Sequence, residues 1–463
     1  MFINENNTLV KYLILELFEK LYRLKKYITI CEKFDRKNNN DKIINLFKES
    51  IRIIGIEIND LCSEINSDLS HAEKFAYIIK ISQNSRAITT IHEELKNLHS
   101  SWILPEVKTF TNEIINSALK DEINIILSDN YSFLESNLGK KFEDSLEIVY
   151  GSTNQFKLSD NHSFILPKIE FSNPLNWTII VHEAGHLQNE DIRKLRDNPD
   201  IIPDNIQSLN ENIIKNWAEE IYCDIYATSL LGPAYFISFV SFALLSTMDF
   251  GISANSSKHP SVIIRASIII NYLTDNNLVF KSSWGINDYC YQFYEYLIDQ
   301  NTIFKDDSQD TIKGLTKFNR NLRKAIKELN LNSFSIGNED ALRISNLLSN
   351  LKNGIPIGSV HNIGEIKLKY LLNKNDLTND ELNQLKYLTS ERRCKIWEIL
   401  NVGWIFKLEN CCKIGESIFF NEINIKEDII DKIDRYGNVI DSLDERLLSS
   451  INTSQIIKII EGN

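Results

Sequence analysis

The segment N-P-L-N-W-T-I-I-V-H-E-A-G-H, which runs from Asn173 to His186, is the starting point for most of what the sequence predicts. An asparagine followed by proline is typical of a helix start, because the side chain can cap the first turn and proline has no N–H to satisfy there. No helix breaker follows before the motif. Residues four apart lie on one helix face, so His182 and His186 would project in the same direction. The segment therefore predicts one helix that presents two imidazoles side by side.

The pattern H-E-x-x-H, formed by His182, Glu183 and His186, is suited to binding a divalent metal ion such as Zn²⁺. The two imidazoles supply two ligands, and the glutamate beside them can hold a water at the open position of the metal. The alternative is a buried helix whose histidines make internal hydrogen bonds, and a third ligand would decide between the two interpretations. The metzincin continuation is excluded, because Asn189 and Ile192 stand where it requires Gly and His.

A candidate third ligand lies in the segment W-A-E-E-I-Y-C-D-I-Y-A, residues 217–227. Glu220 and Asp224 are one helical turn apart, so both can face the histidine pair. Glu220 can reach the metal, and Asp224 can accept the second N–H of a ligand histidine and so fix its tautomer. A lone E-x-x-x-D is usually a solvated helix face, but its position soon after the histidines favours a metal site. Cys223 could approach the same site, although buried packing is the favoured interpretation.

Together, His182-Glu183-x-x-His186 and Glu220-x-x-x-Asp224 resemble the gluzincin pattern of thermolysin-like peptidases. This resemblance implies that Zn²⁺ is held by the two histidines and Glu220. It also implies that Glu183 is the general base, which takes a proton from water and later delivers it to the leaving amine.

A third segment narrows the resemblance. The residues from His259 to Arg265 resemble the H-P-P-x-x-x-R segment that follows the glutamate helix in the CAAX prenyl peptidases and related membrane heat-shock endopeptidases, although Ser261 replaces the second proline. The resemblance covers residues 173–266, about a fifth of the 463 residues. The flanks show none of the transmembrane spans of that family. The resemblance therefore implies a soluble relative or a convergent cousin.

The activity implied is that of a zinc-dependent endopeptidase with a polypeptide substrate. A nearby donor would stabilise the oxyanion formed during attack on the peptide carbonyl. The candidates, in order of preference, are His259, Tyr222 and Tyr226. Arg265 would hold the helix pair together or help at the oxyanion, or it would form an ion pair with Asp224 or Glu219.

Hydrophobic periodicity predicts a predominantly α protein of the α+β class, in which helical flanks surround a zincin-like core with a small edge sheet. Three regions are expected: a helical N-terminal region (1–130), a zinc metallopeptidase core (131–275) and a helical C-terminal region (276–463). The apolar segment 396–404 is expected to pack on the core or to line a substrate groove. Helices are predicted at 8–27, 42–66, 70–82, 84–100, 105–128, 211–231, 260–274, 286–305, 310–330, 338–352, 379–408 and 421–434.

Two strands are predicted before the metal helix, at residues 146–150 and 163–171. Pro167 has no N–H for a sheet ladder, so it would place the second strand at a sheet edge. An edge strand beside a metal helix can hold an extended peptide by strand addition, and we assign that role to 163–171 as a hypothesis. A plain hairpin that covers the core is an equally good interpretation.

The composition restricts the environment and the partners. The net charge of −12 argues against nucleic acid or an anionic membrane as the main partner. The seven cysteines are odd in number and form no C-x-x-C pair, which suits unpaired thiols in a reducing cytoplasm. The uncharged stretch 225–248 is long enough to cross a membrane, but Gly232-Pro233 interrupts it. We therefore predict a cytoplasmic protein without a membrane span.

Two interpretations from other functional classes remain open. The chain could be a catalytically degenerate peptidase fold that serves as a scaffold or binding module, although an intact Glu183 argues against this. It could also be a zinc hydrolase of a non-peptide amide. Large flanks outside the resemblance would suit an effector peptidase with one dedicated protein target.

Overall fold

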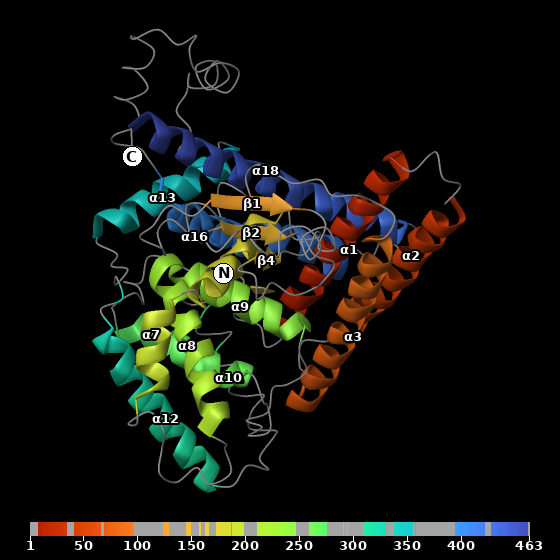
Figure 1. Cartoon of the computed structure of the whole chain (residues 1–463). Coiled ribbons are helices and arrows are strands. Elements are labelled where there is room, and N and C mark those ends of the chain that lie inside the picture. The colour runs from red at the N-terminus through yellow and green to blue at the C-terminus, as the bar shows by residue number, and fades with distance from the viewer. Residues whose placement is uncertain are drawn as a thin grey trace.

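Helices make up most of the structure, a computed structural model, and this confirms the predominantly α class (Figure 1). The residues that it describes are 8–34, 41–65, 69–96, 124–128, 145–149, 157–158, 163–165, 173–186, 188–198, 211–246, 259–275, 290, 294, 309–329, 331, 338–354, 357, 394–421 and 427–461.

The helices fall into three groups along the chain. The first comprises α1 (Thr8–Phe34), α2 (Asp41–Glu64) and α3 (His71–Lys96). The second comprises the 3-10 helix η2 (Pro174–Trp177), α6 (Thr178–Gly185), α7 (Asn189–Arg196), α8 (Glu211–Leu231), α9 (Pro233–Ser246) and α10 (Val262–Asp275). The third comprises α12 (Gln309–Glu328), α13 (Asn338–Lys352), α16 (Ile396–Phe406), the π-helix η6 (Lys407–Cys411), α17 (Cys412–Glu416), the π-helix η7 (Ser417–Asn421) and α18 (Ile429–Glu461).

The two ends of the chain pack against each other. Helix α1 contacts α2, α3 and α18, and α18 also contacts α2, so segments from opposite ends of the sequence lie together (Figure 1). α18 is much longer than the predicted helix 421–434, because Gly437 does not end it and buried apolar residues recur at helical spacing from Ile429 to Ile451. α3 is one helix rather than the two predicted, since Gln83-Asn84 does not interrupt it. Most of the predicted helices 105–128 and 286–305 lies outside the described residues, as does the first half of 379–408, whose described part becomes helical at Ile396.

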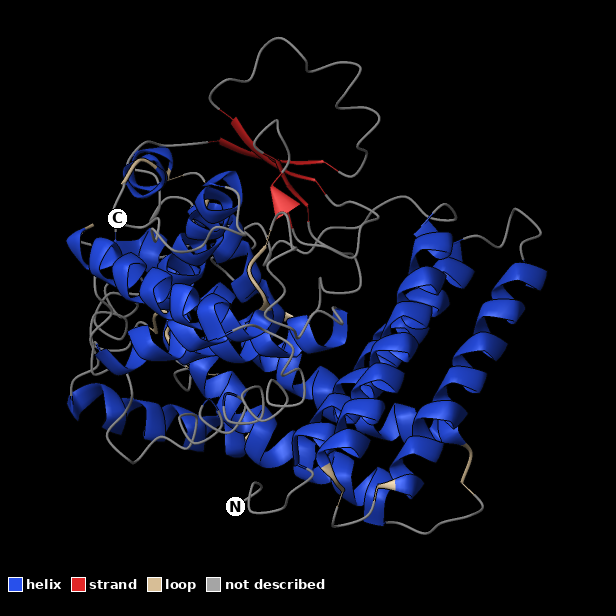
Figure 2. Ribbon diagram, turned by 90° about the horizontal axis from the view of Figure 1, so that it is seen from below, coloured by secondary structure: helices blue, strands red, loops and turns tan. Residues whose placement is uncertain are grey.

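Four short strands form a sheet in the order β1-β2-β4-β3, gathered at one side of the helical body (Figure 2). The first three run parallel, while β3 pairs antiparallel with β4. The prediction that 163–171 is an edge strand is wrong for its described part, because β4 pairs on both sides, and the strand at that edge is β3. The end of the predicted helix 105–128 is also strand. The bounds are β1 (Asn124–Ser128), β2 (Ser145–Val149), β3 (Lys157–Leu158) and β4 (Ser163–Ile165).

The described part of the uncharged stretch, residues 225–246, belongs to the largely buried helices α8 and α9. α8 ends at Gly232, whose φ of 63° is the left-handed conformation that glycine adopts without strain. Asn401 of α16 satisfies the backbone at this break: its amide donates to the carbonyl of Leu231 and accepts from the N–H of Ala234, at 2.8 and 3.1 Å. The apolar segment 396–404 therefore packs on the core, as predicted.

In the described part of the chain, no helix has the combined length and apolar character needed to cross a bilayer.

A buried ion cluster joins the two ends of the chain to the segment that leads into α6. Lys407 contacts Glu16 at 2.6 Å and Glu19 at 2.8 Å, and the guanidinium of Arg23 bridges Glu19 and Asp444 at 2.8 and 2.7 Å. The side-chain amide of Asn173, which precedes η2, donates to Glu19 at 3.3 Å. Contacts thus cross the predicted boundaries at 130 and 275, while the division into three regions stays a prediction.

Three carboxyl groups share two cations in this cluster, so one proton is needed for charge balance. Burial raises the pKa of Asp444 to about 7 and also raises that of Glu16. Burial acts in the same direction on Glu19, but Lys407 and Arg23 outweigh it and hold the pKa of Glu19 at about 2. Burial thus favours protonation of Glu16 and Asp444 over protonation of the central Glu19.

Replacement of Lys407 by methionine would leave Glu16 and Glu19 buried without their shared cation. We expect Lys407→Met to lower the free energy of unfolding by about 3–5 kcal/mol, because an uncompensated buried charge is costly. The exposed pair of Lys48 and Glu32 provides the control, since Lys48→Met should cost less than about 1 kcal/mol. Urea unfolding measures both values, and equal costs would contradict the expectation.

The stability should also depend on pH through Asp444. Its pKa rises from an ordinary 3.8 to about 7 on folding, so this group favours the folded state most at low pH and loses that contribution as pH rises to 7. Asp444→Asn cannot ionise and lacks this dependence. From pH 5 to pH 8 we expect the variant to gain on the order of 2 kcal/mol relative to the natural protein. A constant difference in urea unfolding across this range would contradict the prediction.

Candidate metal centre

The close approach of α6 and α8 brings the candidate ligands together. Gly185 makes it possible, because a Cβ at this position would lie 2.9 Å from the Cα of Cys223 and 3.1 Å from its Sγ. Any side chain here would therefore push the two helices apart. Cys223 is fully buried in this contact. The prediction that Cys223 serves in packing is confirmed by this placement.

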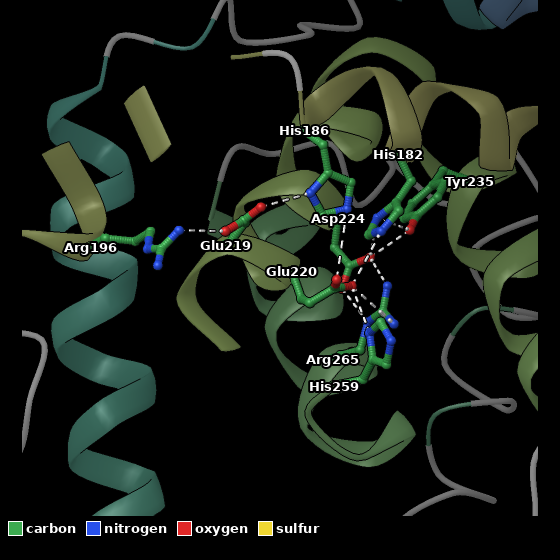
Figure 3. A network of polar contacts seen from close by, with 9 residues as sticks. All are labelled: His182, His186, Arg196, Glu219, Glu220, Asp224, Tyr235, His259 and Arg265. Carbon is green, nitrogen blue, oxygen red and sulfur yellow. Dashed lines mark hydrogen bonds and ion pairs between the residues drawn. The ribbon is translucent and has the colours of Figure 1, made fainter. Parts of the chain in front are cut away.

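His182 is held through Nδ1. This nitrogen lies 3.0 Å from Oδ1 of Asp224 and 3.2 Å from the hydroxyl of Tyr235, a fully buried residue of α9 (Figure 3). Because a carboxylate accepts hydrogen bonds, the proton of the neutral ring belongs on Nδ1. Nε2 then carries the lone pair, and it lies 3.4 Å from Oε2 of Glu220. The ring is thus oriented with a ligand atom toward Glu220.

Asp224 is fixed in turn by Arg265. The guanidinium donates through Nε and Nη2 at 2.7 and 2.6 Å, and the hydroxyl of Tyr235 donates to the same carboxylate at 2.5 Å. Arg265 also lies over the ring of Phe239, 4.6 Å from its centroid. Burial would raise the pKa of Asp224, but Arg265 and His182 hold it at about 2. An ion pair of Arg265 was predicted with either Asp224 or Glu219. The structure shows the pair with Asp224.

His186 is held by a different carboxylate. Its Nδ1 lies 3.0 Å from Oε1 of Glu219, and Oε2 of that glutamate accepts from Arg196 at 3.2 Å. Nε2 of His186 lies 3.7 Å from Oε1 of Glu220. The ring planes of the two histidines are nearly perpendicular, with centroids 5.3 Å apart. Each histidine thus turns one nitrogen to a supporting carboxylate and the other toward Glu220.

The donor atoms of His182, His186 and Glu220 lie close enough together to share one metal ion. Zinc–ligand bonds of about 2.0–2.1 Å keep neighbouring ligand atoms roughly 3.3–3.4 Å apart. The ligand atoms of His182 and His186 lie 3.4 and 3.7 Å from oxygens of Glu220, and one atom from each of the three residues lies within 4.8 Å of the others. Two imidazole nitrogens and a carboxylate form a donor set that zinc prefers. The three predicted ligands can therefore hold a metal.

The charge distribution at the site also favours a cation. Burial disfavours the imidazolium of His182, yet hydrogen bonds to Asp224 and Glu220 outweigh this effect and raise its pKa to about 9. Burial would likewise raise the pKa of Glu220, but contacts with His182, His259 and Arg265 keep it well below its usual range. A metal ion would compete with the proton for the same negative environment.

The three predicted catalytic residues, His259, Glu183 and Tyr222, differ in their surroundings. Nδ1 of His259 is 3.1 Å from Oε2 of Glu220, and 60% of its side chain is exposed, so it stands at the open side of the cluster. Glu183 is half-buried between the two histidines on α6. The hydroxyl of Tyr222 instead donates to Asp191 of α7 at 3.3 Å, and its ring stacks on Tyr226. This contact does not favour Tyr222 as an oxyanion donor.

Sequence reasoning did not identify Tyr235, or Glu219 with Arg196, as supports of the two histidines. Tyr235 lies 53 residues after His182, on the helix that follows the Gly232 break. No local spacing links it to the motif. Glu219 directly precedes the predicted ligand and was considered as a partner of Arg265 alone. Glu219 and Glu220 put two carboxylates on adjacent sides of α8. This acidic pair is the sequence signal that could have identified Glu219 as a support of His186.

The tight contact at Gly185 can be tested directly. Gly185→Ala should lower the free energy of unfolding by about 1–3 kcal/mol, because the new methyl group meets the backbone of α8. It should also weaken zinc binding, since the helices that carry the ligands must separate. Both effects can be measured by urea unfolding and zinc titration. Adding Cys223→Ala removes the sulfur but not the Cα, so full rescue by that second change would contradict this explanation.

No protein-family model matches the chain, and comparison with curated proteins and with solved structures gave no match.

Proposed function

We propose that this chain is a zinc-dependent endopeptidase with a zincin-like core. The observation that carries the proposal is the convergence of His182, His186 and Glu220, whose ligand atoms all lie within 4.8 Å of one another. Both imidazoles are also held in the tautomer that leaves Nε2 as the ligand atom. A structural zinc site usually has four protein ligands, whereas three ligands leave a position for water or substrate.

Zinc at this site would acidify a water molecule and polarise a substrate carbonyl. The chain supplies the proton transfers. Glu183 lies between the two candidate histidines in the sequence, on the short helix α6, and we assign it the role of taking a proton from the attacking water. The same carboxyl group then delivers this proton to the leaving amine. The side chain of Glu183 is half-buried.

Stabilisation of the oxyanion is assigned to His259. Its side chain stands at the open side of Glu220, where a substrate carbonyl would approach, and an imidazole can donate a hydrogen bond there. Arg265 is committed to Asp224 through two hydrogen bonds and lies largely buried behind the ligands. We therefore assign Arg265 a positioning role and keep His259 as the oxyanion donor.

The sheet offers a place for an extended peptide. β3 forms an edge, runs antiparallel to its neighbour β4, and contacts the metal helix α6. A peptide that adds to a sheet edge gains main-chain hydrogen bonds that do not depend on its sequence. We propose that substrate binds along β3, in place of the segment 163–171 assigned from the sequence. This assignment favours a polypeptide over a small amide as substrate.

The general-base role of Glu183 has a direct test. Glu183→Gln keeps the size of the side chain but removes the proton acceptor, so we expect zinc binding to stay and peptide cleavage to fall by a factor of at least about 10². Cleavage can be measured on a mixture of peptides from a digested unfolded protein, with new termini identified by mass spectrometry. Glu190→Gln, which alters an exposed glutamate on α7, should leave both quantities unchanged.

The outcomes separate the proposal from its alternatives. Full activity of Glu183→Gln would show that another group is the base. A protein that binds zinc but cleaves no peptide in the mixture would favour hydrolysis of a non-peptide amide. A protein without zinc and without cleavage would favour a scaffold or binding module.

A further inference from the structure

We infer that Glu219 and Arg196 position His186, and that the docking of α7 thereby sets how tightly the centre holds its metal. This inference rests on the metal site proposed above. The two residues supply a second chain of contacts from an arginine through a carboxylate to a ligand histidine, on the opposite side of the centre from Arg265 and Asp224 (Figure 3). Neither residue is a metal ligand, so each acts through His186.

The two chains of contacts have the same chemical order. In the first, Arg265 donates to Asp224, which accepts from Nδ1 of His182 at 3.0 Å. In the second, Arg196 donates to Glu219 at 3.2 Å, and Glu219 lies 3.0 Å from Nδ1 of His186. Each carboxylate fixes one ring so that Nε2 faces the metal position. Loss of either carboxylate frees the ring to rotate and to change tautomer.

The two chains differ in their exposure to solvent. Asp224 is fully buried and the side chain of Arg265 is 14% exposed, whereas those of Glu219 and Arg196 are 26% and 42% exposed. Solvent screens the second pair, so its attraction is weaker and depends on salt. His186 is therefore the ligand whose position responds to conditions, while His182 is fixed by the core.

Arg196 reaches Glu219 because α7 docks on α8. Ile192 and Leu195 of α7 are buried, α7 packs on α8, and the hydroxyl of Tyr222 donates to Asp191 on the same helix at 3.3 Å. α7 begins three residues after His186. A shift of α7 would therefore move Arg196 away from Glu219 and loosen the hold on His186. The metal affinity is in this way linked to the position of a surface helix.

The test compares zinc dissociation constants of full-length variants, obtained by competition with a chromophoric chelator. Glu219→Ala should weaken zinc binding roughly 10- to 100-fold, the usual effect of losing a carboxylate behind a ligand histidine. Glu219→Gln keeps an oxygen that can accept from Nδ1 and should restore part of the affinity. Visible spectra of the cobalt-substituted proteins should show an altered coordination geometry in Glu219→Ala and a nearly natural one in Glu219→Gln.

Arg196→Ala tests the outer half of the contact chain. We expect Arg196→Ala to lose less zinc affinity than Glu219→Ala does. The zinc affinity of Arg196→Ala should also depend less on salt than that of the control Arg193→Ala, which removes another exposed arginine of the same helix and keeps the screened pair of Arg196 with Glu219. Circular dichroism would confirm that the variants are folded. If the natural protein binds zinc and Glu219→Ala binds it equally well, with an unchanged cobalt spectrum, the inference is overturned while the metal site stands. If the natural protein binds no zinc, both the site and the inference fall.

Discussion

The contact between Gly185 on α6 and Cys223 on α8 is the constraint on which the centre depends. The absence of a side chain at Gly185 lets the helices approach until a methyl group would clash with the opposite backbone. At this separation, the histidines of one helix face the carboxylates of the other. The helix that carries the candidate histidine ligands thus also leaves the space for Glu220 of α8. This explains how the short motif and α8, whose Glu219 lies 33 residues after His186, form one site.

Buried charge then fixes what the helix contact brings together. Asp224 accepts from a histidine, a tyrosine and an arginine, so an otherwise costly buried carboxylate becomes a rigid support for His182. A second buried cluster, around Glu19, connects both ends of the chain to Asn173. This residue directly precedes the segment that carries His182 and His186. The flanking helices therefore take part in holding the segment that leads into the centre.

The sequence was informative where chemistry depends on local spacing. Helical periodicity placed His182, His186, Glu220 and Asp224 correctly on facing helices, and the resemblance added Arg265. The sequence did not identify contacts that depend on tertiary structure. Tyr235 and the pair Glu219–Arg196 contact the histidines from other helices, and no sequence spacing relates these residues to the motif. The edge position was assigned to 163–171 because Pro167 suggested it, but strand order depends on long-range pairing, which places β3 at the edge.

Whether His182, His186 and Glu220 hold one zinc ion can be measured from the metal content and metal coordination of the purified protein. The account predicts about one zinc per chain, with two imidazole nitrogens and a carboxylate oxygen around it in the X-ray absorption spectrum. His186→Ala should lose this zinc. A protein that takes up no zinc when it is supplied, or one whose zinc is unaffected by His186→Ala, would contradict the proposed zinc site.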